Sequence, residues 1–159
     1  MIGPPSVILH KNNANVFYDK NLKWLVDIDF YIQYLKAGRI AYINSPLINV
    51  GIGPEQVTRD CFRQRAIEIP EAFHLFNKLG FGRMKNVLVY DAWWRLVRNL
   101  EIKSARDIAA SGYGGELPIA IQSIIRWQSK MPAFVLKTGI FSKVLMFLNY
   151  LFNYNRIAD

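Results

Sequence analysis

Several residue types that mark common functional sites are scarce in this sequence. It holds a single cysteine, Cys61, among 159 residues, which excludes an internal disulfide and agrees with a reducing compartment. The two histidines, His10 and His74, lie far apart, so we expect each to have an ordinary surface or core position. The glycine-rich stretch Gly112–Gly115 does not follow a strand pattern, so it predicts a loop and not a phosphate-binding site. The sequence thus gives no sign of zinc binding or of catalysis by a cysteine or serine nucleophile.

Long apolar runs are also lacking. The most apolar window, "GIFSKVLMFLNYLF" at 139–152, contains Lys143 and is shorter than the roughly 20 residues that a membrane-spanning helix needs. A core helix is the simplest interpretation, and a helix in a membrane interface or against a partner helix is the alternative. The opening residues "MIGPPSV" lack the basic and apolar segments of a signal peptide. We therefore expect a cytoplasmic chain, at the inner face of the membrane if its helices touch lipid.

Apolar residues and positive charge are abundant. Apolar side chains make up 52% of the residues, which is enough for a packed core, and the formal net charge is +8. Residues 1–80 carry 9 Lys/Arg against 7 Asp/Glu, whereas residues 81–159 carry 11 against 5. Four aromatic residues stand among the charges of the second half: Tyr90, Trp93, Trp94 and Trp127. The pattern fits a basic helical module that binds an anionic membrane surface or nucleic acid, and it equally fits solvated basic helix faces around an aromatic core.

Two acids lie within the apolar stretch "LKWLVDIDFYIQYLKAGR" at 22–39. On a strand Asp27 and Asp29 would share one face, as in a metal-binding D-x-D pair. On a helix they would point roughly 200° apart, because successive residues turn by about 100°. The apolar residues repeat at helical spacing and Gly38 stands where a C-terminal cap belongs. The stretch therefore predicts a helix in which the two carboxylates have separate roles.

The remaining patterns predict a mixed first part and a helical second part. "RIAYIN" at 39–44 and "SPLINVGIG" at 45–53 have the character of short strands, and a helical pattern runs from Gln56 to Leu79. After Gly80–Arg83 four further stretches predict helices: 86–102, 104–112, 117–128 and 131–154. We therefore expect an α/β part with few strands followed by an all-α extension. So few strands make a poor independent sheet, which suggests part of a larger α/β domain.

Three stretches together resemble a known enzyme family. They are "GPPSVILHK" at 3–11, "YDKNLKWLVDIDFYIQYLKAG" at 18–38 and "YINSPLINVGIGPEQVT" at 42–58. In order and spacing they resemble the C-terminal half of the catalytic domain of family-2 glycosyltransferases, and the later helices look like the helical tail of many bacterial members. The resemblance implies a partial GT-A fold, with residues 1–80 as the acceptor-side part and residues 81–159 as a helical extension.

The resemblance also implies a reaction. Family members transfer a sugar from a nucleotide-sugar donor to an acceptor hydroxyl, usually with inversion; here a saccharide or lipid-linked acceptor in cell-envelope polysaccharide or glycoconjugate synthesis is expected. The first acid of the family's paired-acid motif is the general base, and it matches Asp27. A carboxylate within hydrogen-bond reach can take the proton of the attacking hydroxyl. Asp29 would then bond a backbone donor or a basic neighbour. Without the resemblance, Asp27 fits a solvated or helix-capping carboxylate.

Three further residues match positions that the resemblance connects with substrate, and Trp24 is a candidate because of the chemistry of its ring. Pro5 and Ser6 match a G-x-P-S motif on the acceptor side of the donor pocket, although a plain proline-rich turn fits equally. Trp24 offers a flat apolar surface for a sugar ring, and at helical spacing it also fits a core position. Gln56 stands in the Q-V-T segment, where helix capping or a polar contact is expected. Many members have a histidine just before this segment, but this chain has Gly53 in that region.

The resemblance leaves one component of the enzyme unmatched. In the family, the nucleotide-binding strands and the metal-binding D-x-D lie in the first half of the catalytic domain, which these 159 residues do not match. A divalent metal, Mg²⁺ or Mn²⁺, is expected in the complete enzyme and none on this chain alone. We therefore expect little or no transfer by the isolated chain.

Overall fold

The structure is a computed structural model that describes residues 8–11, 15–36, 41–49, 51, 53 and 60–157. The chain divides into two compact units, Met1–Phe62 and Arg63–Asp159. The sequence predicts the start of the helical part at Gly80–Arg83, whereas the second unit already begins at Arg63, because helix α3, Arg65–Leu79, packs with the helical elements that follow it.

In the first unit, the predicted acid-bearing helix is present as α1, Val26–Leu35. Its core residue is Phe30, which stacks on Tyr18 with ring centroids 4.5 Å apart and on Tyr34 at 5.7 Å. The hydroxyl of Tyr34 donates to the backbone oxygen of Lys11, which holds the preceding extended segment against the helix. The helix ends at Leu35 with Lys36 as its C-cap, and the expected cap Gly38 lies outside the described residues.

The prediction of an α/β fold is wrong. No strand forms among the residues that the structure describes, and the segments expected as strands are irregular through 41–49. Tyr42, Ile43 and Leu47 are largely exposed there. A strand is stable only when a neighbouring strand takes up its backbone hydrogen bonds and a core covers its apolar face. The described part of the chain supplies neither for this segment, so its local alternation does not produce a sheet.

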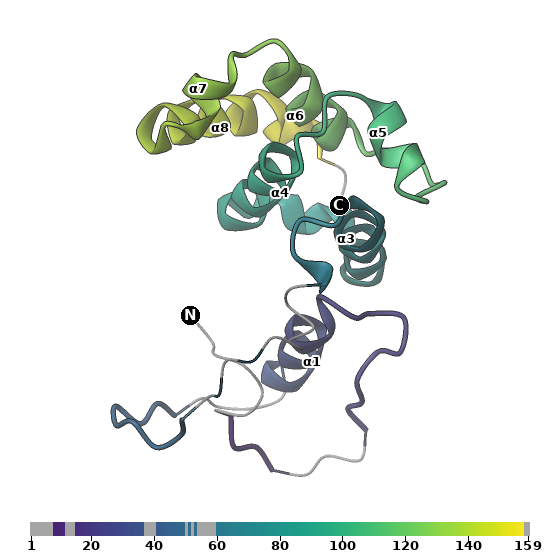
Figure 1. Cartoon of the computed structure of the whole chain (residues 1–159). Helices are drawn as coiled ribbons and strands as arrows, with labels where there is room; N and C mark the ends of the chain where they lie inside the picture. Colours follow the sequence, from purple (N-terminus) through teal and green to yellow (C-terminus); the bar gives the residue numbers. More distant parts are fainter. Residues whose placement is uncertain are drawn as a thin grey trace. The chain divides into compact units, whose positions relative to one another are not determined.

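The second unit is helical, in agreement with the pattern of residues 81–159 (Figure 1). Its elements are α3 Arg65–Leu79, η2 Phe81–Lys85, α4 Val87–Asn99, α5 Ala105–Ala110, α6 Ile119–Ser129, α7 Ala133–Lys137, α8 Gly139–Asn153 and η3 Tyr154–Arg156. Pro118 and Pro132 are the N-cap residues of α6 and α7, where proline's missing N–H leaves no helical hydrogen bond unmade. The side chain of Asn86 caps α4 by accepting from Leu88 N at 2.9 Å.

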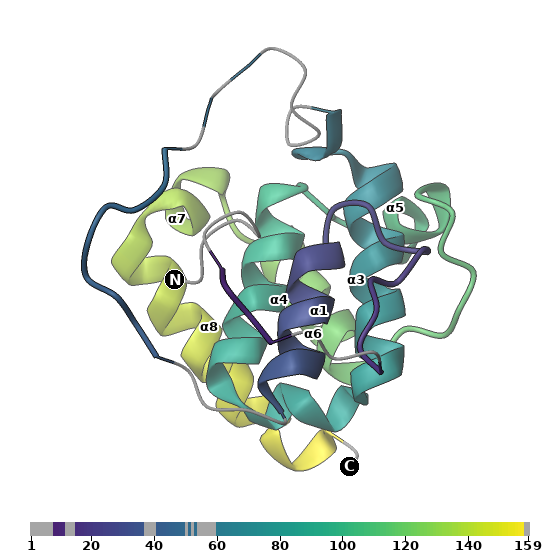
Figure 2. The ribbon, with the colours of Figure 1, turned by 90° about the horizontal axis from the view of Figure 1, so that it is seen from below.

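The core of this unit is built around α4. Trp93 faces α3, where it contacts Phe73 and Phe76 with ring centroids 5.0 Å apart in each pair. Trp94 and Tyr90 are buried on the side of α4 that meets α8. Figure 2 shows α8 running alongside α4. Three of the four aromatic residues that the sequence places among the charges, Tyr90, Trp93 and Trp94, are therefore buried core residues.

Candidate functional site

Asp27 lies in the first turn of α1 and is partly buried. Burial raises the pKa of its carboxyl group above the ordinary value of 3.8, because removal from water disfavours the charged form. Tyr31 follows four residues later on the same side of the helix. The pKa of the Tyr31 phenol is also raised, mainly by burial and then by the negative charge of the Asp27 carboxylate. A carboxylate with increased basicity thus lies beside a phenol on one face of α1.

Asp29 has a different environment. Its side chain is fully buried, and one carboxylate oxygen accepts from the Gln33 amide at 2.7 Å. The predicted separation of the two acids agrees with the structure, because the helix turns them to different sides. The pair therefore does not form a D-x-D arrangement, in which both carboxylates would face one metal ion.

Several aromatic side chains belong to the same unit as Asp27. Trp24 is partly buried and meets Phe62 at a centroid distance of 6.4 Å. Tyr31 follows Asp27 by about one turn of α1, whereas Trp24 lies just before the helix, in the segment that leads into it. Tyr18 is about half exposed. Flat rings next to a carboxylate suit a sugar, because its apolar face packs on an aromatic ring while its hydroxyls reach polar groups.

The other residues that the sequence connected with substrate are not placed. Pro5, Ser6 and Gln56 lie outside the described residues. The structure therefore places Asp27, partly buried, in the first turn of α1, with Trp24 just before the helix, turns Asp29 inward, and leaves the remaining assignments as predictions. Sequence reasoning missed Tyr31 and Tyr18, although the i+4 spacing of Tyr31 from Asp27 was a usable signal.

No cluster of three or more His, Cys, Asp or Glu side chains that could hold a metal ion is found among the described residues. The divalent metal expected in the complete enzyme stays a prediction.

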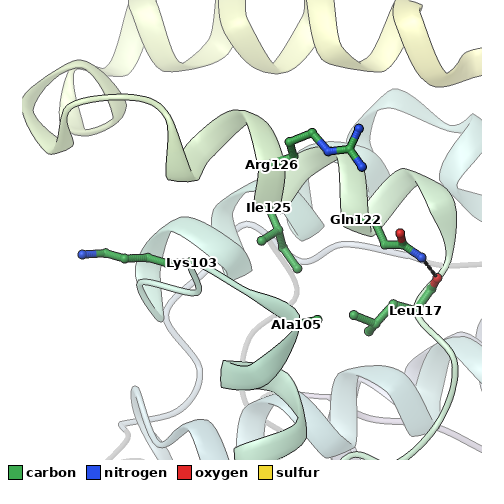
Figure 3. Close-up of a pocket in the computed structure, with 6 residues that line it drawn as sticks. All are labelled: Lys103, Ala105, Leu117, Gln122, Ile125 and Arg126. Atoms are coloured by element: carbon green, nitrogen blue, oxygen red, sulfur yellow. Dashed lines mark hydrogen bonds between the residues drawn. The ribbon is translucent and has the colours of Figure 1, made fainter.

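Two surface hollows lie in the second unit. The larger, of about 500 Å³, is lined by Lys103, Ala105, Leu117, Gln122, Ile125 and Arg126. In Figure 3 the Gln122 amide donates to Leu117 O, and Lys103 points away from the other lining side chains, so the two cations do not converge. The smaller hollow, of about 220 Å³, lies between α6 and the end of α8 and is lined by both Arg126 and Arg156. Neither hollow is lined by Asp27 or another residue of α1.

The inward face of α8 carries a set of buried polar side chains that the sequence reading also missed. Ser142, Asn149 and Asn153 are buried and bonded to α4 and α6. Trp94 Nε1 donates to Ser142 Oγ at 3.0 Å, and Asn149 Nδ2 donates to Ser123 Oγ at 3.0 Å. The polar residues recur at spacings of seven and four, which is a helical signal that was open to inspection in the sequence.

The chain was compared with known proteins and searched for membrane spans. No match was found among protein-family models, curated proteins or solved structures. In the described part of the chain, every helix is too short or too polar to cross a bilayer. The resemblance to family-2 glycosyltransferases therefore depends on the quoted sequence motifs alone.

Proposed function

We propose that this chain supplies the acceptor side of an enzyme that transfers a sugar from a nucleotide-sugar donor to an acceptor hydroxyl, with Asp27 as the general base. The observation that carries the proposal is the position of Asp27. It is the first acid of the motif that resembles the family's paired acids, and it stands partly buried in the first turn of α1 with a raised pKa. Asp29, the second acid, is buried and bonded to Gln33, which suits a supporting role.

The chemistry requires a base at the attacking oxygen. As the acceptor hydroxyl attacks the anomeric carbon, its proton passes to the Asp27 carboxylate, and the bond between that carbon and the nucleoside diphosphate breaks on the opposite side. The sugar configuration is inverted, and the diphosphate leaves with the electron pair. A carboxylate whose pKa is raised by burial is a better proton acceptor than an exposed one.

Neighbouring residues would position the acceptor. Tyr31 lies one helical turn from Asp27, so a sugar ring packed on its phenol ring would hold a hydroxyl near the carboxylate; Trp24, just before α1, is a second candidate platform. We assign the donor and its divalent metal, Mg²⁺ or Mn²⁺, to polypeptide that these 159 residues do not include. Nucleotide-sugar donors and a cell-envelope acceptor place the reaction in the cytoplasm or at the inner face of the membrane.

The test is a transfer assay on the enzyme that contains this segment. Release of nucleoside diphosphate from UDP-, GDP- and dTDP-sugars is measured with membrane lipids and oligosaccharides as acceptors. We expect Asp27→Asn to lower kcat/KM by about 10²- to 10⁴-fold, the usual contribution of a general base. The matched control is Asp60→Asn, since Asp60 is an exposed acid of the same unit, and it should stay within about twofold.

Two outcomes would contradict the proposal separately. If the wild-type enzyme releases no diphosphate from any donor, sugar transfer is wrong. If Asp27→Asn keeps the rate of Asp60→Asn, transfer stands and the assignment of the base is wrong. Circular dichroism of both variants checks that they fold alike.

A further inference from the structure

Helix α8 is amphipathic in the opposite sense to a usual surface helix. Its buried residues are Ser142, Met146, Asn149 and Asn153, three of which are polar. Its exposed residues are mostly large and apolar: Ile140, Phe141, Val144, Phe147, Leu148, Leu151 and Phe152. A helix of a water-facing surface normally turns its apolar side to the core. Here the apolar side is directed outward.

The outward residues form one continuous face. With about 100° of rotation per residue, the seven apolar side chains fall within an arc of roughly 140°. The four buried residues fall within an arc of roughly 60° on the opposite side. The helix has 15 residues and is about 22 Å long, so this face extends over four turns. An exposed apolar surface of this extent marks an interaction site.

The neighbouring helix α7 carries a further exposed ring. Helix α7 lies beside α8 (Figure 1), and its Phe134 is largely exposed. We define the α7–α8 face as Phe134 together with the seven exposed apolar residues of α8. The polar residues beneath it are held by hydrogen bonds to α4 and α6, so α8 cannot simply roll to bury its apolar side.

The stretch of sequence that contains α7 and α8 carries charges of one sign. Residues 117–158 contain five Lys/Arg and no Asp or Glu. Lys143 stands about 40° from Phe147 at the edge of the apolar arc, and Lys137 ends α7. At the other end of α8 the Arg156 guanidinium lies 4.6 Å from the centre of the Phe152 ring. Apolar side chains flanked by cations fit a binding partner that has an apolar interior and a negatively charged outer layer.

We propose that the α7–α8 face docks on the surface of an anionic lipid bilayer. Helix α8 lies in the plane of the interface with its apolar side chains among the upper acyl chains. Lys137, Lys143 and Arg156 contact headgroup phosphates. Such in-plane binding combines apolar burial with attraction to anionic lipid, which is the combination present here. A second copy of the α7–α8 face would bring like charges together, which disfavours an interface between two copies.

The test is co-sedimentation of the full chain with lipid vesicles. Vesicles of phosphatidylcholine with one quarter phosphatidylglycerol are compared with phosphatidylcholine alone. We expect the anionic vesicles to bind roughly tenfold more tightly or better, with a loss of this preference at high salt. Equal binding to both compositions, or binding to neither, would overturn the proposal.

Matched variants separate the apolar and the charge contributions. Phe141→Ser with Phe147→Ser should weaken binding roughly tenfold or more, because two rings no longer enter the bilayer. The control Leu88→Ser changes a 74% exposed residue of α4 and should bind as the wild type does. Lys137→Glu with Lys143→Glu should remove the preference for anionic vesicles, whereas Arg106→Glu on α5 should weaken it by less than threefold or so.

Other occupants of the face would give different results. If the wild-type chain forms a dimer that the double Phe→Ser variant does not, and vesicles are not bound, the face is an interface between copies and the proposal is wrong. All these substitutions are at exposed positions, and circular dichroism verifies that they fold. Vesicle binding requires no sugar transfer, so failure of this proposal leaves the assignment of Asp27 standing, and the reverse also holds.

Discussion

The buried hydroxyl of Tyr90 gives the sharpest test of how α8 is oriented. It donates to Asn149 Oδ1 at 2.6 Å and accepts from Asn153 Nδ2 at 3.3 Å, and all three side chains are buried. Burial raises the pKa of this phenol far above its usual value, so it carries its proton at every ordinary pH. The contact exists only if the polar side of α8 faces α4. The perturbation is Tyr90→Phe, which removes one oxygen and keeps the ring.

The expected cost follows from the partners that remain. Asn153 Nδ2 keeps Ser123 Oγ at 2.9 Å and Asn149 O at 2.7 Å. Asn149 Oδ1 loses the hydroxyl donor while it stays buried. A buried polar atom that loses its partner costs about 1–3 kcal/mol. The ring volume is unchanged, so little is added for a cavity. We expect the free energy of unfolding to fall by about 2 kcal/mol, a large share of the 5–15 kcal/mol typical of a domain.

Urea unfolding followed by circular dichroism measures this loss as a lower midpoint at unchanged slope. The control is Tyr154→Phe, since Tyr154 is exposed and should change the free energy by less than about 0.5 kcal/mol. If Tyr90→Phe also stays within about 0.5 kcal/mol, the polar side of α8 does not face α4. The outward direction of the α7–α8 face would then be wrong as well.

Three further predictions concern single residues. Ser142→Ala should lower the free energy of unfolding by about 1–3 kcal/mol, because the buried Trp94 Nε1 loses its acceptor at 3.0 Å, and urea midpoints measure it. Asp27→Asn should leave the free energy of unfolding at pH 7 unchanged or slightly raised. Burial raises the pKa of Asp27, so the folded state favours the protonated carboxyl group. This contribution to stability is complete below pH 3.8 and is lost as pH rises through the folded pKa. A lower thermal midpoint for this variant at pH 7 would contradict that reasoning. Asp107 should behave in the opposite way, because hydrogen bonds from the Lys103 and Ser104 backbone N–H groups lower its pKa. The Asp107 carboxylate contributes about 1 kcal/mol to the free energy of unfolding, as such a cap does. This contribution is present above pH 3.8 and is lost as pH falls through the lower folded pKa. Asp107→Asn should therefore show a flatter dependence of stability on pH between about pH 2 and 5, and an unchanged dependence would refute the capping role of Asp107.

The helices could be predicted from the sequence because their signals are local. The apolar period around Asp27 predicts α1, and Pro118 and Pro132 predict the starts of α6 and α7. The segment 41–49 shows the limit of such signals. Its alternation is also local, but a strand depends on a partner elsewhere in the chain, and none is found for it among the described residues.

The orientation of α8 depends on residues distant in sequence. Its apolar window suggests a core helix, yet Ser142 and Asn149 are turned inward by Trp94 and Tyr90, which are 48 and 59 residues away. Polar side chains at helical spacing can be recognised in the sequence, but their partners cannot.

The candidate site was also only partly predictable from the sequence. The helical turn predicts that Asp27 and Asp29 separate, whereas the raised pKa of Asp27 depends on packing that only the structure gives.

The pH dependence of sugar transfer by the enzyme that contains this segment tests the role of Asp27 most directly. If Asp27 is the general base, kcat/KM falls as pH is lowered through an apparent pKa above 3.8, and this limb is missing from the residual activity of Asp27→Asn. The same acid limb in both proteins would contradict it.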